Sequence, residues 1–235
     1  MTTTLITGGN KGLGYETARR LLAEGHDVII GSRDPERGRR AARELGARRL
    51  RLDVTDDASV SAAAKAVEAE GGLDVLVNNA GVEGRLPDGG VRGAGEETAD
   101  TLRPVLETNV LGLVRVTAAF LPLLRRSPAP VVVNLGSGLA SLAHMTTEGT
   151  PFHGYPGIAY PVSKAAVNMI TVQYAKAFPE MRVNAVDPGY TRTDLNANTG
   201  TRTVEEGAEV IVRLATVGPD GPTGGYFDAD GPLPW

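Results

Sequence analysis

The sequence predicts a doubly wound α/β fold, a three-layer sandwich in which a parallel sheet of about seven strands lies between two layers of helices. Strand-like segments alternate with helical segments along the whole chain, and this order is typical of a parallel sheet with helices on both faces. The strands are also short apolar runs without polar alternation, such as Val131–Leu135. Runs of this kind indicate strands that are buried on both faces.

The elements follow in order from their residue types and from the signals at their ends. The first strand is the β-rich run Thr3–Thr7, and helical periodicity then covers residues 15–24 and stops at Gly25. Later strands are expected at residues 28–30, 49–52, 75–77, 131–135, 182–186 and 226–227, and helices at residues 35–45, 58–69, 98–124, 160–178 and 204–215. We expect residues 1–235 to form a single domain, as α/β chains of this length commonly do.

Composition excludes several classes of function. The chain has 41% hydrophobic and 22% charged residues, a net charge of −4 and no cysteine. This weakly acidic chain offers no electrostatic footprint for nucleic acid or an anionic membrane, and without cysteine there is no disulfide, thiolate nucleophile or Cys-zinc site. The histidines, His26, His144 and His153, lack metal-ligand spacing, so we expect no metal. With no leader segment and no apolar run of membrane-spanning length, we expect a soluble, cytoplasmic protein.

The turn after the first strand has the spacing Gly-x-x-x-Gly-x-Gly, at Gly8, Gly12 and Gly14. Glycines there let the backbone approach a pyrophosphate closely, and a helix that begins at Leu13 directs free N–H groups and its positive dipole end at that charge. This is the arrangement of a Rossmann-type dinucleotide site. Asn10 and Lys11 lie within the turn and are further candidates for cofactor binding. A glycine turn without a ligand is the alternative.

The end of the second strand predicts which dinucleotide binds. A carboxylate there accepts hydrogen bonds from the adenosine ribose and selects NAD, whereas arginine accommodates a 2′-phosphate. The strand ends in Ser32 and Arg33, and Lys11 lies in the neighbouring turn, so two cations and a hydroxyl favour NADP(H). Asp34 argues for NAD, but we interpret it as the cap of the helix that begins at Pro35.

Tyr160 and Lys164, four residues apart, are the candidate catalytic pair. Residues at this spacing stack on one face of a helix, and a cation beside a phenol lowers the phenol pKa from about 10. A proton donor is most effective when its pKa approaches the working pH. Pro161 is tolerated only in a first helical turn. This sets Tyr160 at a helix N-terminus, where the dipole also favours the phenolate.

Further motifs appear in an order that resembles the short-chain dehydrogenase/reductase superfamily over nearly the whole chain. Besides the glycine turn and the tyrosine–lysine pair, they are Asp53-Val54, Asn78-Asn79-Ala80-Gly81, Asn109, Asn134-Leu135-Gly136-Ser137, and Asp187-Pro188-Gly189 with Thr193. The residues at 10–11, 32–34 and 188–194 look most like the NADPH-dependent carbonyl reductase branch. The resemblance implies an enzyme that uses NADP(H) to reduce a ketone or aldehyde reversibly, with a small-molecule carbonyl or alcohol as substrate.

The resemblance also implies a role for each residue. Tyr160 donates a proton to the carbonyl oxygen, Ser137 hydrogen-bonds the same oxygen, and Lys164 lowers the pKa of Tyr160 and holds the nicotinamide ribose. Asn109 orders a water that links the lysine to a proton relay. Expected cofactor contacts are Asp53 and Val54 at the adenine, Asn79, Ala80 and Gly81 along the cofactor, and Pro188, Gly189, Thr191 and Thr193 at the nicotinamide. Plainer alternatives make Ser137 a turn residue, Asn109 an ordinary helix asparagine and Asn134 structural.

The stretch between Ser137 and Tyr160 is about ten residues longer than is common in the superfamily it resembles. We expect the insert at 140–158 and the polar segment 190–203 to form the substrate-gating wall, because ligands bind outside the carboxyl ends of strands in doubly wound sheets. Apolar side chains in the insert predict an apolar, aromatic carbonyl substrate, with His153 as a hydrogen-bonding group at the pocket edge. The alternative is an insert that only decorates the surface.

The helices at 98–124 and 160–178 are apolar on nearly every side, and such helices are buried all round. The sheet covers one side of each, so we expect a two-fold interface and a homodimer or homotetramer. Ser163 is expected at the surface and Thr203 at a helix N-cap. Two other functions stay open: an NADP(H)-binding regulatory sensor on the same fold, disfavoured by the tyrosine and lysine, and an NAD-dependent alcohol dehydrogenase, disfavoured by Ser32 and Arg33.

Overall fold

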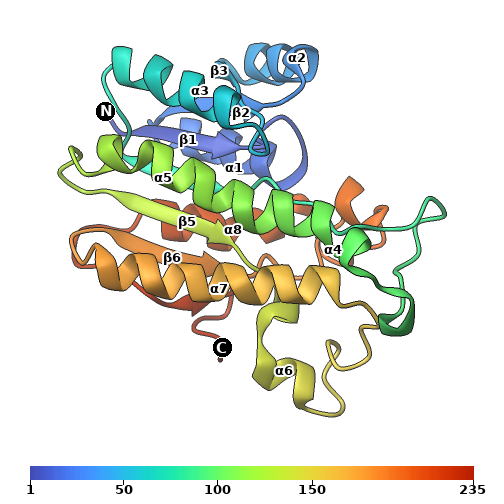
Figure 1. The fold of residues 1–235 in the computed structure, drawn as a ribbon. Helices are drawn as coiled ribbons and strands as arrows, with labels where there is room; N and C mark the ends of the chain where they lie inside the picture. The colour runs from blue at the N-terminus through green and yellow to red at the C-terminus, as the bar shows by residue number, and fades with distance from the viewer.

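A seven-stranded sheet forms the centre of the molecule (Figure 1). The computed structural model describes all 235 residues. The strands are β1 (Thr3–Thr7), β2 (Asp27–Ser32), β3 (Arg48–Arg51), β4 (Val75–Asn78), β5 (Val131–Leu135), β6 (Arg182–Val186) and β7 (Tyr226–Phe227). Their order is β3-β2-β1-β4-β5-β6-β7, and all neighbouring pairs are parallel. The predicted doubly wound α/β fold is confirmed.

Helices cover both faces of this sheet. They are α1 (Gly12–Ala23), α2 (Pro35–Leu45), α3 (Asp57–Ala69), α4 (Ala99–Leu106), α5 (Gly112–Leu124), α6 (Leu142–Thr146), α7 (Ala159–Ala177) and α8 (Val204–Ala215). One face is covered by α1, α2 and α8, and the other by α3, α5 and α7. The short helix α6 lies outside these layers, below the start of α7 in Figure 1. Single turns of 3₁₀ helix are η1 (Ala94–Glu96), η3 (Gly138–Ala140) and η4 (Asp194–Asn196).

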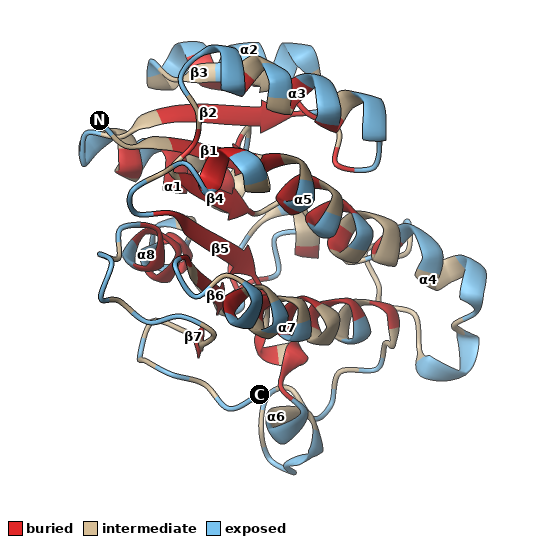
Figure 2. Ribbon diagram, turned by 60° about the vertical axis from the view of Figure 1, so that its left-hand side comes forward, coloured by how far each residue is buried: buried red, intermediate tan, exposed pale blue.

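Each face of the sheet has its own hydrophobic core. Ile6 and Ile30 belong to the core under α1, α2 and α8, whereas their neighbours Leu5 and Ile29 belong to the core under α3, α5 and α7. Because successive side chains of a strand point to opposite faces, a strand covered on both sides needs apolar residues in succession. Figure 2 shows the buried strands in red between helices whose outer surfaces are exposed.

Two helix caps agree with the sequence. Asp34 accepts hydrogen bonds from the N–H groups of Glu36 and Arg37 at the start of α2. Thr203 accepts one from the N–H of Glu206 at the start of α8, and the Glu206 side chain accepts one from the N–H of Thr203 in return. Such caps satisfy N–H groups that have no partner within the helix. The predicted caps at Asp34 and Thr203 are confirmed.

The long helix expected at residues 98–124 is interrupted. Between α4 and α5 the turn η2 (Glu107–Leu111) is a π-helix, which holds the buried Asn109. Taken as one helix, Ala99–Leu124 has the length and composition of a membrane span. Core helices of soluble proteins have these properties too, and Val116 and Phe120 on α5 are buried in the core.

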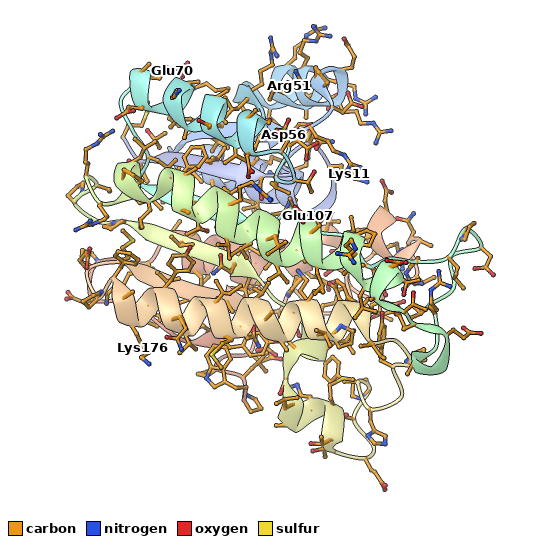
Figure 3. The ribbon with its side chains drawn as sticks, viewed as in Figure 1. Lys11, Arg51, Asp56, Glu70, Glu107 and Lys176 are labelled. Carbon is orange, nitrogen blue, oxygen red and sulfur yellow. The ribbon has the colours of Figure 1, made fainter.

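The chain winds outward in both directions from the neighbouring central strands β1 and β4. At such a switch point the connections leave the carboxyl ends of the two strands toward opposite faces, and a crevice remains between them. Figure 3 shows Lys11 and Glu107 toward this end of the molecule, whereas Glu70 and Lys176 lie toward the opposite end. The crevice is where the site residues collect.

Candidate active site

A cavity of about 1400 Å³ opens at the carboxyl ends of the strands. Segments that follow β1 to β6 build its wall, which is the position expected for a ligand in a doubly wound sheet. The predicted site residues that line the cavity are Gly8, Asn10, Lys11, Gly12, Leu13, Arg33, Asp53, Val54, Asn79, Ala80, Gly81, Ser137, Tyr160, Lys164, Pro188, Gly189, Thr191 and Thr193. Gly14, Ser32 and Asn109 are not part of the wall.

The glycine turn after β1 lies against the start of α1. Gly8 and Gly12 have φ angles of 66° and 53°, in the left-handed region that glycine adopts readily. A Cβ on Gly14 would lie 2.5 Å from Nδ2 of Asn79 and 2.9 Å from the carbonyl oxygen of Gly8, so the close packing needs glycine. No side chain caps the first turn of α1, and its free N–H groups are available to an anion.

Asn79 fixes the glycine turn from the end of β4. Its Nδ2 donates to the carbonyl oxygen of Thr7 at 2.7 Å. The Thr7 hydroxyl accepts from the N–H groups of Asn79 and Ala80 at 3.0 and 2.9 Å. These bonds join the ends of the two central strands, so Asn79 shapes the turn as well as lining the cavity.

At the end of β2 the Asp34 carboxylate has hydrogen-bond partners, whereas the Arg33 guanidinium has none. Asp34 Oδ1 accepts from the N–H groups of Glu36 and Arg37 at 2.9 and 3.1 Å. Arg33 is exposed at the cavity wall and makes no ion pair or side-chain hydrogen bond. The Ser32 hydroxyl is buried and donates to the carbonyl oxygen of Asp34 at 2.9 Å. The Ser32 side chain does not line the cavity, and its expected role in holding the cofactor stays a prediction.

Lys11 has a partner that the sequence did not predict. Its Nζ lies 2.8 Å from Oδ2 of Asp194, and the two side chains are 54% and 65% exposed. The Lys11 ammonium holds the pKa of Asp194 below its ordinary value. This ion pair joins the glycine turn to the segment 190–203 at the cavity wall.

Asp53, beside Val54 in the cavity wall, is held as a carboxylate. Burial by itself raises the pKa of Asp53, but hydrogen bonds from Thr55 and the positive charges of Arg33 and Arg51 together lower it below its ordinary value. Oδ1 of Asp53 accepts from the N–H and the hydroxyl of Thr55 at 3.0 and 2.8 Å. The carboxylate therefore stays ionised near neutral pH.

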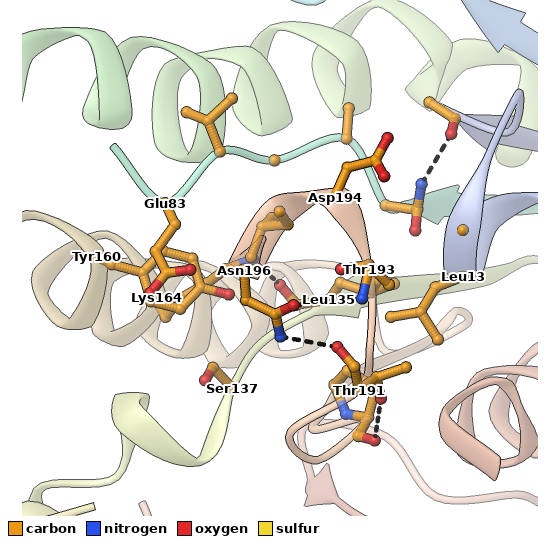
Figure 4. Close-up of a pocket in the computed structure, with 18 of the residues that line it drawn as sticks. Leu13, Glu83, Leu135, Ser137, Tyr160, Lys164, Thr191, Thr193, Asp194 and Asn196 are labelled. Carbon is orange, nitrogen blue, oxygen red and sulfur yellow. Dashed lines mark hydrogen bonds between the residues drawn. The ribbon is translucent and has the colours of Figure 1, made fainter. Parts of the chain in front are cut away.

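Tyr160 lies in the first turn of α7, and Lys164 follows one turn later. The Lys164 Nζ is buried, donates to the carbonyl oxygen of Leu135 at 2.6 Å and lies 5.5 Å from the centre of the Tyr160 ring. Leu135 ends β5, and Ser137 follows two residues later. The end of β5 thus holds the lysine and carries the serine, and Figure 4 shows Tyr160, Lys164 and Ser137 around one pocket.

The pKa of Tyr160 differs from the sequence-based expectation. Burial raises it, the negative charges of Glu83 and Asp187 raise it further, and hydrogen bonding with the Ser137 side chain offsets only part of the rise. Burial also lowers the pKa of Lys164 to about 8, against the opposing effect of Asp187. The expected lowering of the Tyr160 pKa is therefore wrong for the protein by itself, because a buried site disfavours the phenolate. Tyr160 stays protonated at neutral pH.

Asn109 holds the segment that follows β4. Its Oδ1 accepts from the N–H of Val82 at 2.8 Å, and its Nδ2 donates to the carbonyl oxygen of Val82 at 2.8 Å and to the Ser163 hydroxyl at 3.0 Å. Both amide hydrogens are used, so the expected role of Asn109 in ordering a water stays a prediction. The expectation of a surface position for Ser163 is wrong: it is fully buried and donates to the carbonyl oxygen of Tyr160 at 2.7 Å.

Asn134 has the structural position that the plainer alternative gave it. Its Oδ1 accepts from Nδ2 of Asn78 at 2.8 Å, and its Nδ2 donates to the hydroxyl of Thr171 at 2.9 Å. All three side chains are buried, and buried amides need such partners. The network joins β4, β5 and α7 behind the cavity.

The turn after β6 forms another part of the cavity wall. Gly189 has a φ of 71°, and its N–H donates to Oδ1 of Asp187 at 2.9 Å. Burial raises the pKa of Asp187. The Thr191 hydroxyl donates to the carbonyl oxygen of Pro188 at 2.9 Å and so stabilises the turn. Asp187 is a buried titratable group of the site that the sequence marked only as part of a motif.

The insert at 140–158 supplies Pro151, Phe152 and Tyr155 to the cavity wall. The Phe152 ring stacks on His144 with ring centres 5.1 Å apart. Besides η3 and α6, the insert consists of turns and irregular backbone, as its glycines and prolines predict. His153 is exposed and does not line the cavity. Its Nδ1 is 3.1 Å from the carbonyl oxygen of Met145. The position predicted for His153 at the pocket edge is wrong.

The sequence interpretation missed several charged residues of the wall, among them Glu83, Arg85, Arg202 and Asp228. Glu83 and Arg85 line the cavity and form an ion pair, with Nε of Arg85 2.8 Å from Oε2 of Glu83. The sequence did contain a signal that could have identified Glu83, because it follows the Asn-Asn-Ala-Gly motif, a predicted part of the cofactor site, by two residues.

Comparisons with known proteins agree with this geometry. A family model described as short chain dehydrogenase matches residues 2–204. The (+)-neomenthol dehydrogenase of Capsicum annuum is 33% identical over 295 residues, which cover 95% of this chain and 94% of the relative. That alignment is longer than the 235 residues of this chain, so the relative carries segments that this chain lacks.

Solved structures give the same result. Salutaridine reductase from Papaver somniferum has a TM-score of 0.85 at 30% identity, covering 97% of this chain and 99% of the other. An NADPH-bound carbonyl reductase from chicken fatty liver has a TM-score of 0.83 at 25% identity, covering 100% of this chain and 99% of the other. Both proteins are reductases by name, and both match this chain from end to end.

Proposed function

Because the chain belongs to the short-chain dehydrogenase family, an oxidoreductase family that binds a nicotinamide cofactor, we propose that it is an NADPH-dependent reductase of ketones or aldehydes that works reversibly. The observation that carries this proposal is the meeting of Tyr160, Ser137 and Lys164 in one cavity with an uncapped helix N-terminus behind a glycine turn. A proton donor, a hydroxyl donor and a dinucleotide cradle are the parts that carbonyl reduction needs.

The residues of the cavity fit a nicotinamide dinucleotide. The open N-terminus of α1, with Gly8 and Gly12 of the glycine turn in the cavity wall, suits a pyrophosphate. In this proposal Arg33 holds the 2′-phosphate, Lys164 holds the nicotinamide ribose, and Pro188 and Gly189 hold the nicotinamide. When bound, the cofactor supplies the hydride that adds to the carbonyl carbon.

The protein groups move the proton. In the proposed mechanism the Tyr160 hydroxyl gives its proton to the carbonyl oxygen, so that the alcohol forms and a phenolate remains. The Ser137 hydroxyl donates a hydrogen bond to the same oxygen and stabilises the charge that develops there. The Lys164 ammonium, 5.5 Å from the centre of the tyrosine ring, stabilises the phenolate until it is protonated again. The raised pKa keeps the Tyr160 phenol protonated at neutral pH, as reduction requires, but it also makes the phenol a weaker acid, so proton transfer depends on hydrogen bonding with Ser137 and on the charge of Lys164.

The preference for NADPH over NADH is part of the proposal. Similar proteins have been solved with NADPH and with NADH, so the choice rests on residues of this chain. Oδ1 of Asp34 caps α2 and Oδ2 lies 3.3 Å from Nε of Arg37, so both oxygens of this carboxylate already have partners in the protein. Arg33 is unpaired, and Lys11 is nearby in the glycine turn. These observations support a 2′-phosphate site.

We also propose a cytoplasmic homodimer or homotetramer without nucleic-acid or membrane partners. Large apolar side chains are exposed on neighbouring helices: Leu111 and Val114 near the start of α5, and Val162 and Met169 on α7, are 51%, 36%, 45% and 60% exposed. Figure 1 shows α5 and α7 running beside each other along one side of the molecule. A symmetry mate that covers both helices would bury these residues.

A regulatory NADP(H) sensor is the main rival, and an NAD-dependent dehydrogenase is the second. The test is incubation with NADPH or NADH and a panel of aliphatic, aromatic, quinone and steroid carbonyls, followed by the absorbance of the reduced nicotinamide. We expect turnover with NADPH and a fall of at least about 10²-fold in Tyr160→Phe, with NADPH binding nearly unchanged.

Tyr174→Phe is the matched control for that variant. It makes the same chemical change on the same helix, but Tyr174 packs on Phe178, with ring centres 6.2 Å apart, and does not line the cavity. It should keep normal turnover. Binding of NADPH without turnover of any carbonyl would favour the sensor, and full activity of Tyr160→Phe would assign the proton donor elsewhere.

A further inference from the structure

Three side chains join the segment after β4 to the insert. The Glu83 carboxylate accepts two hydrogen bonds from Arg85, from Nε at 2.8 Å and from Nη2 at 3.0 Å. It also accepts one from the Tyr155 hydroxyl at 3.1 Å. Nη1 of Arg85 donates to the carbonyl oxygen of Gly89 at 2.6 Å. The three form a polar cluster, here called the Glu83 cluster, between residues that are 72 positions apart in the chain.

The Glu83 cluster faces the reaction site. All three of its members line the cavity that contains Tyr160, and the Glu83 and Arg85 side chains are only 5% and 18% exposed. In Figure 4 the Glu83 side chain extends from its loop toward Tyr160 and Lys164. The charge on Glu83 is close enough to raise the pKa values of both Tyr155 and Tyr160. The polar wall therefore borders the space in which a carbonyl substrate must lie.

Internal contacts do not use all the hydrogen-bonding capacity of the cluster. The guanidinium has five N–H donors, of which one at Nε, one at Nη2 and one at Nη1 have partners. One N–H on each terminal nitrogen remains. A carboxylate has about four acceptor positions, and three on Glu83 are filled. Glu83 can still accept one bond and Arg85 can still donate two.

The charge balance of the cluster favours a neutral partner. Arg85 neutralises Glu83 through a bidentate contact, so neither a cationic nor an anionic group gains a net attraction. A group that donates to the carboxylate and accepts from the guanidinium uses the remaining capacity of both. A hydroxyl group does both. An aliphatic or purely aromatic surface would instead leave these buried polar atoms without water or a partner, which is costly.

We propose that the Glu83 cluster is a subsite for a hydroxyl group of the substrate, and that this enzyme reduces carbonyl compounds that carry a hydroxyl on the same skeleton. This inference rests on the proposed reductase function. It replaces the sequence-based expectation of an apolar aromatic substrate with an aromatic or alicyclic carbonyl that has a second, hydrogen-bonding oxygen. Glu83 and Arg85 are then specificity-determining residues, whereas Tyr160 and Ser137 act on the carbonyl itself.

The first test uses the wild-type protein and matched substrates. The kcat/KM with NADPH is measured for acetophenone and benzaldehyde and for their meta- and para-hydroxy derivatives, each beside the corresponding methoxy compound. Methoxy has a similar electronic effect on the carbonyl but has no O–H to donate. We expect at least one hydroxy isomer to exceed its methoxy partner by about 10-fold or more, as a hydrogen bond to a charged group gives. Hydroxy and methoxy compounds of equal efficiency at every ring position would overturn the inference.

The second test removes the charge of the acceptor with Glu83→Gln. The amide keeps the size of the side chain and can still accept from Tyr155, but it pairs poorly with Arg85. We expect the hydroxy-to-methoxy ratio to fall toward one. Because the charge of Glu83 also raises the pKa of Tyr160, the kcat/KM for unsubstituted acetophenone is measured in the same variant, and only the change in the ratio is read as the effect on the subsite. A merely structural role predicts another result, in which all substrates lose equally and the ratio is kept, and that result would overturn the inference. If the variant is insoluble, the wild-type ratios decide alone.

The readouts separate the inference from the function on which it rests. No turnover of any carbonyl with either cofactor is a failure of the proposed function. Turnover without a preference for hydroxy compounds is a failure of the subsite alone. Tyr155→Phe is the matched structural control, because it removes one donor to Glu83 while Glu83 and Arg85 stay paired. Tyr155→Phe should lower the melting temperature and keep the hydroxy-to-methoxy ratio. Loss of the ratio with an unchanged melting temperature would assign the subsite to Tyr155 instead of Glu83.

Discussion

Cofactor choice should depend more on Arg33 than on Lys11, and the structure gives the reason. Arg33 is exposed at the cavity wall without a partner, whereas Lys11 is already paired with Asp194 at 2.8 Å. A 2′-phosphate therefore gains a contact from Arg33 without breaking another. To bind Lys11, the phosphate must compete with Asp194. Three variants test this difference: Arg33→Ala, Lys11→Ala and Asp194→Asn.

The magnitudes follow from the partners of each cation. A charge-assisted hydrogen bond contributes about 1.5–3 kcal/mol, so Arg33→Ala should lower kcat/KM for NADPH by about 10- to 150-fold. The ion pair of Lys11 lies more than half exposed, and such pairs stabilise by only about 0–1 kcal/mol. A phosphate that binds Lys11 must break this ion pair, which offsets part of the free energy that the new contact contributes. Lys11→Ala should therefore lower kcat/KM for NADPH less than Arg33→Ala does. Asp194→Asn frees Lys11 and should raise kcat/KM for NADPH by up to about fivefold.

The assay is steady-state kinetics with NADPH and NADH on one carbonyl substrate at two salt concentrations. Efficiency with NADH should change by less than about threefold in all three variants, because NADH has no 2′-phosphate. The gain in Asp194→Asn should shrink at high salt, since exposed charges are screened. An unchanged NADPH-to-NADH ratio in Arg33→Ala, or a lower ratio in Asp194→Asn, would refute the reasoning.

Three further outcomes are expected. Burial lowers the pKa of Lys164 to about 8, so its ammonium is present below that pH and kcat/KM for reduction should fall as pH rises through about 8; Lys164→Arg should move the fall to higher pH, and a flat profile would contradict the role of the charge. Trimming residues 146–153 removes Phe152 from the cavity wall and should change the ranking of substrates with NADPH affinity within about threefold; an unchanged ranking would leave the insert out of recognition. Light scattering should give a multiple of 24.6 kDa for the wild type and that mass for Met169→Glu, because Met169 is 60% exposed on α7; a monomeric wild type would refute the interface.

The fold and the candidate catalytic pair, Tyr160 and Lys164, follow from short-range features of the sequence. The alternation of strands and helices and the apolar runs such as Val131–Leu135 report burial directly, because a strand covered on both faces needs successive apolar residues. The glycine turn and the spacing of Tyr160 and Lys164 depend on the geometry of one turn and one helix. The short polar signals at Asp34 and Thr203 set helix starts within three residues. In each case the interacting groups are close in the chain.

The surroundings of the site depend on which segments meet at the carboxyl ends of the strands, and only the tertiary structure decided this. Ser163 was expected at the surface but is buried against Asn109, from which it is 54 positions away in the chain. Lys11 pairs with Asp194 across 183 positions, and Glu83 meets Tyr155 across 72. Burial in that crevice also raised the pKa of the Tyr160 phenol, opposite to the effect expected from its neighbouring lysine. Residue type and local spacing give the elements and their chemistry, whereas contacts between distant loops and the desolvation they cause exist only once the sheet has brought those loops together.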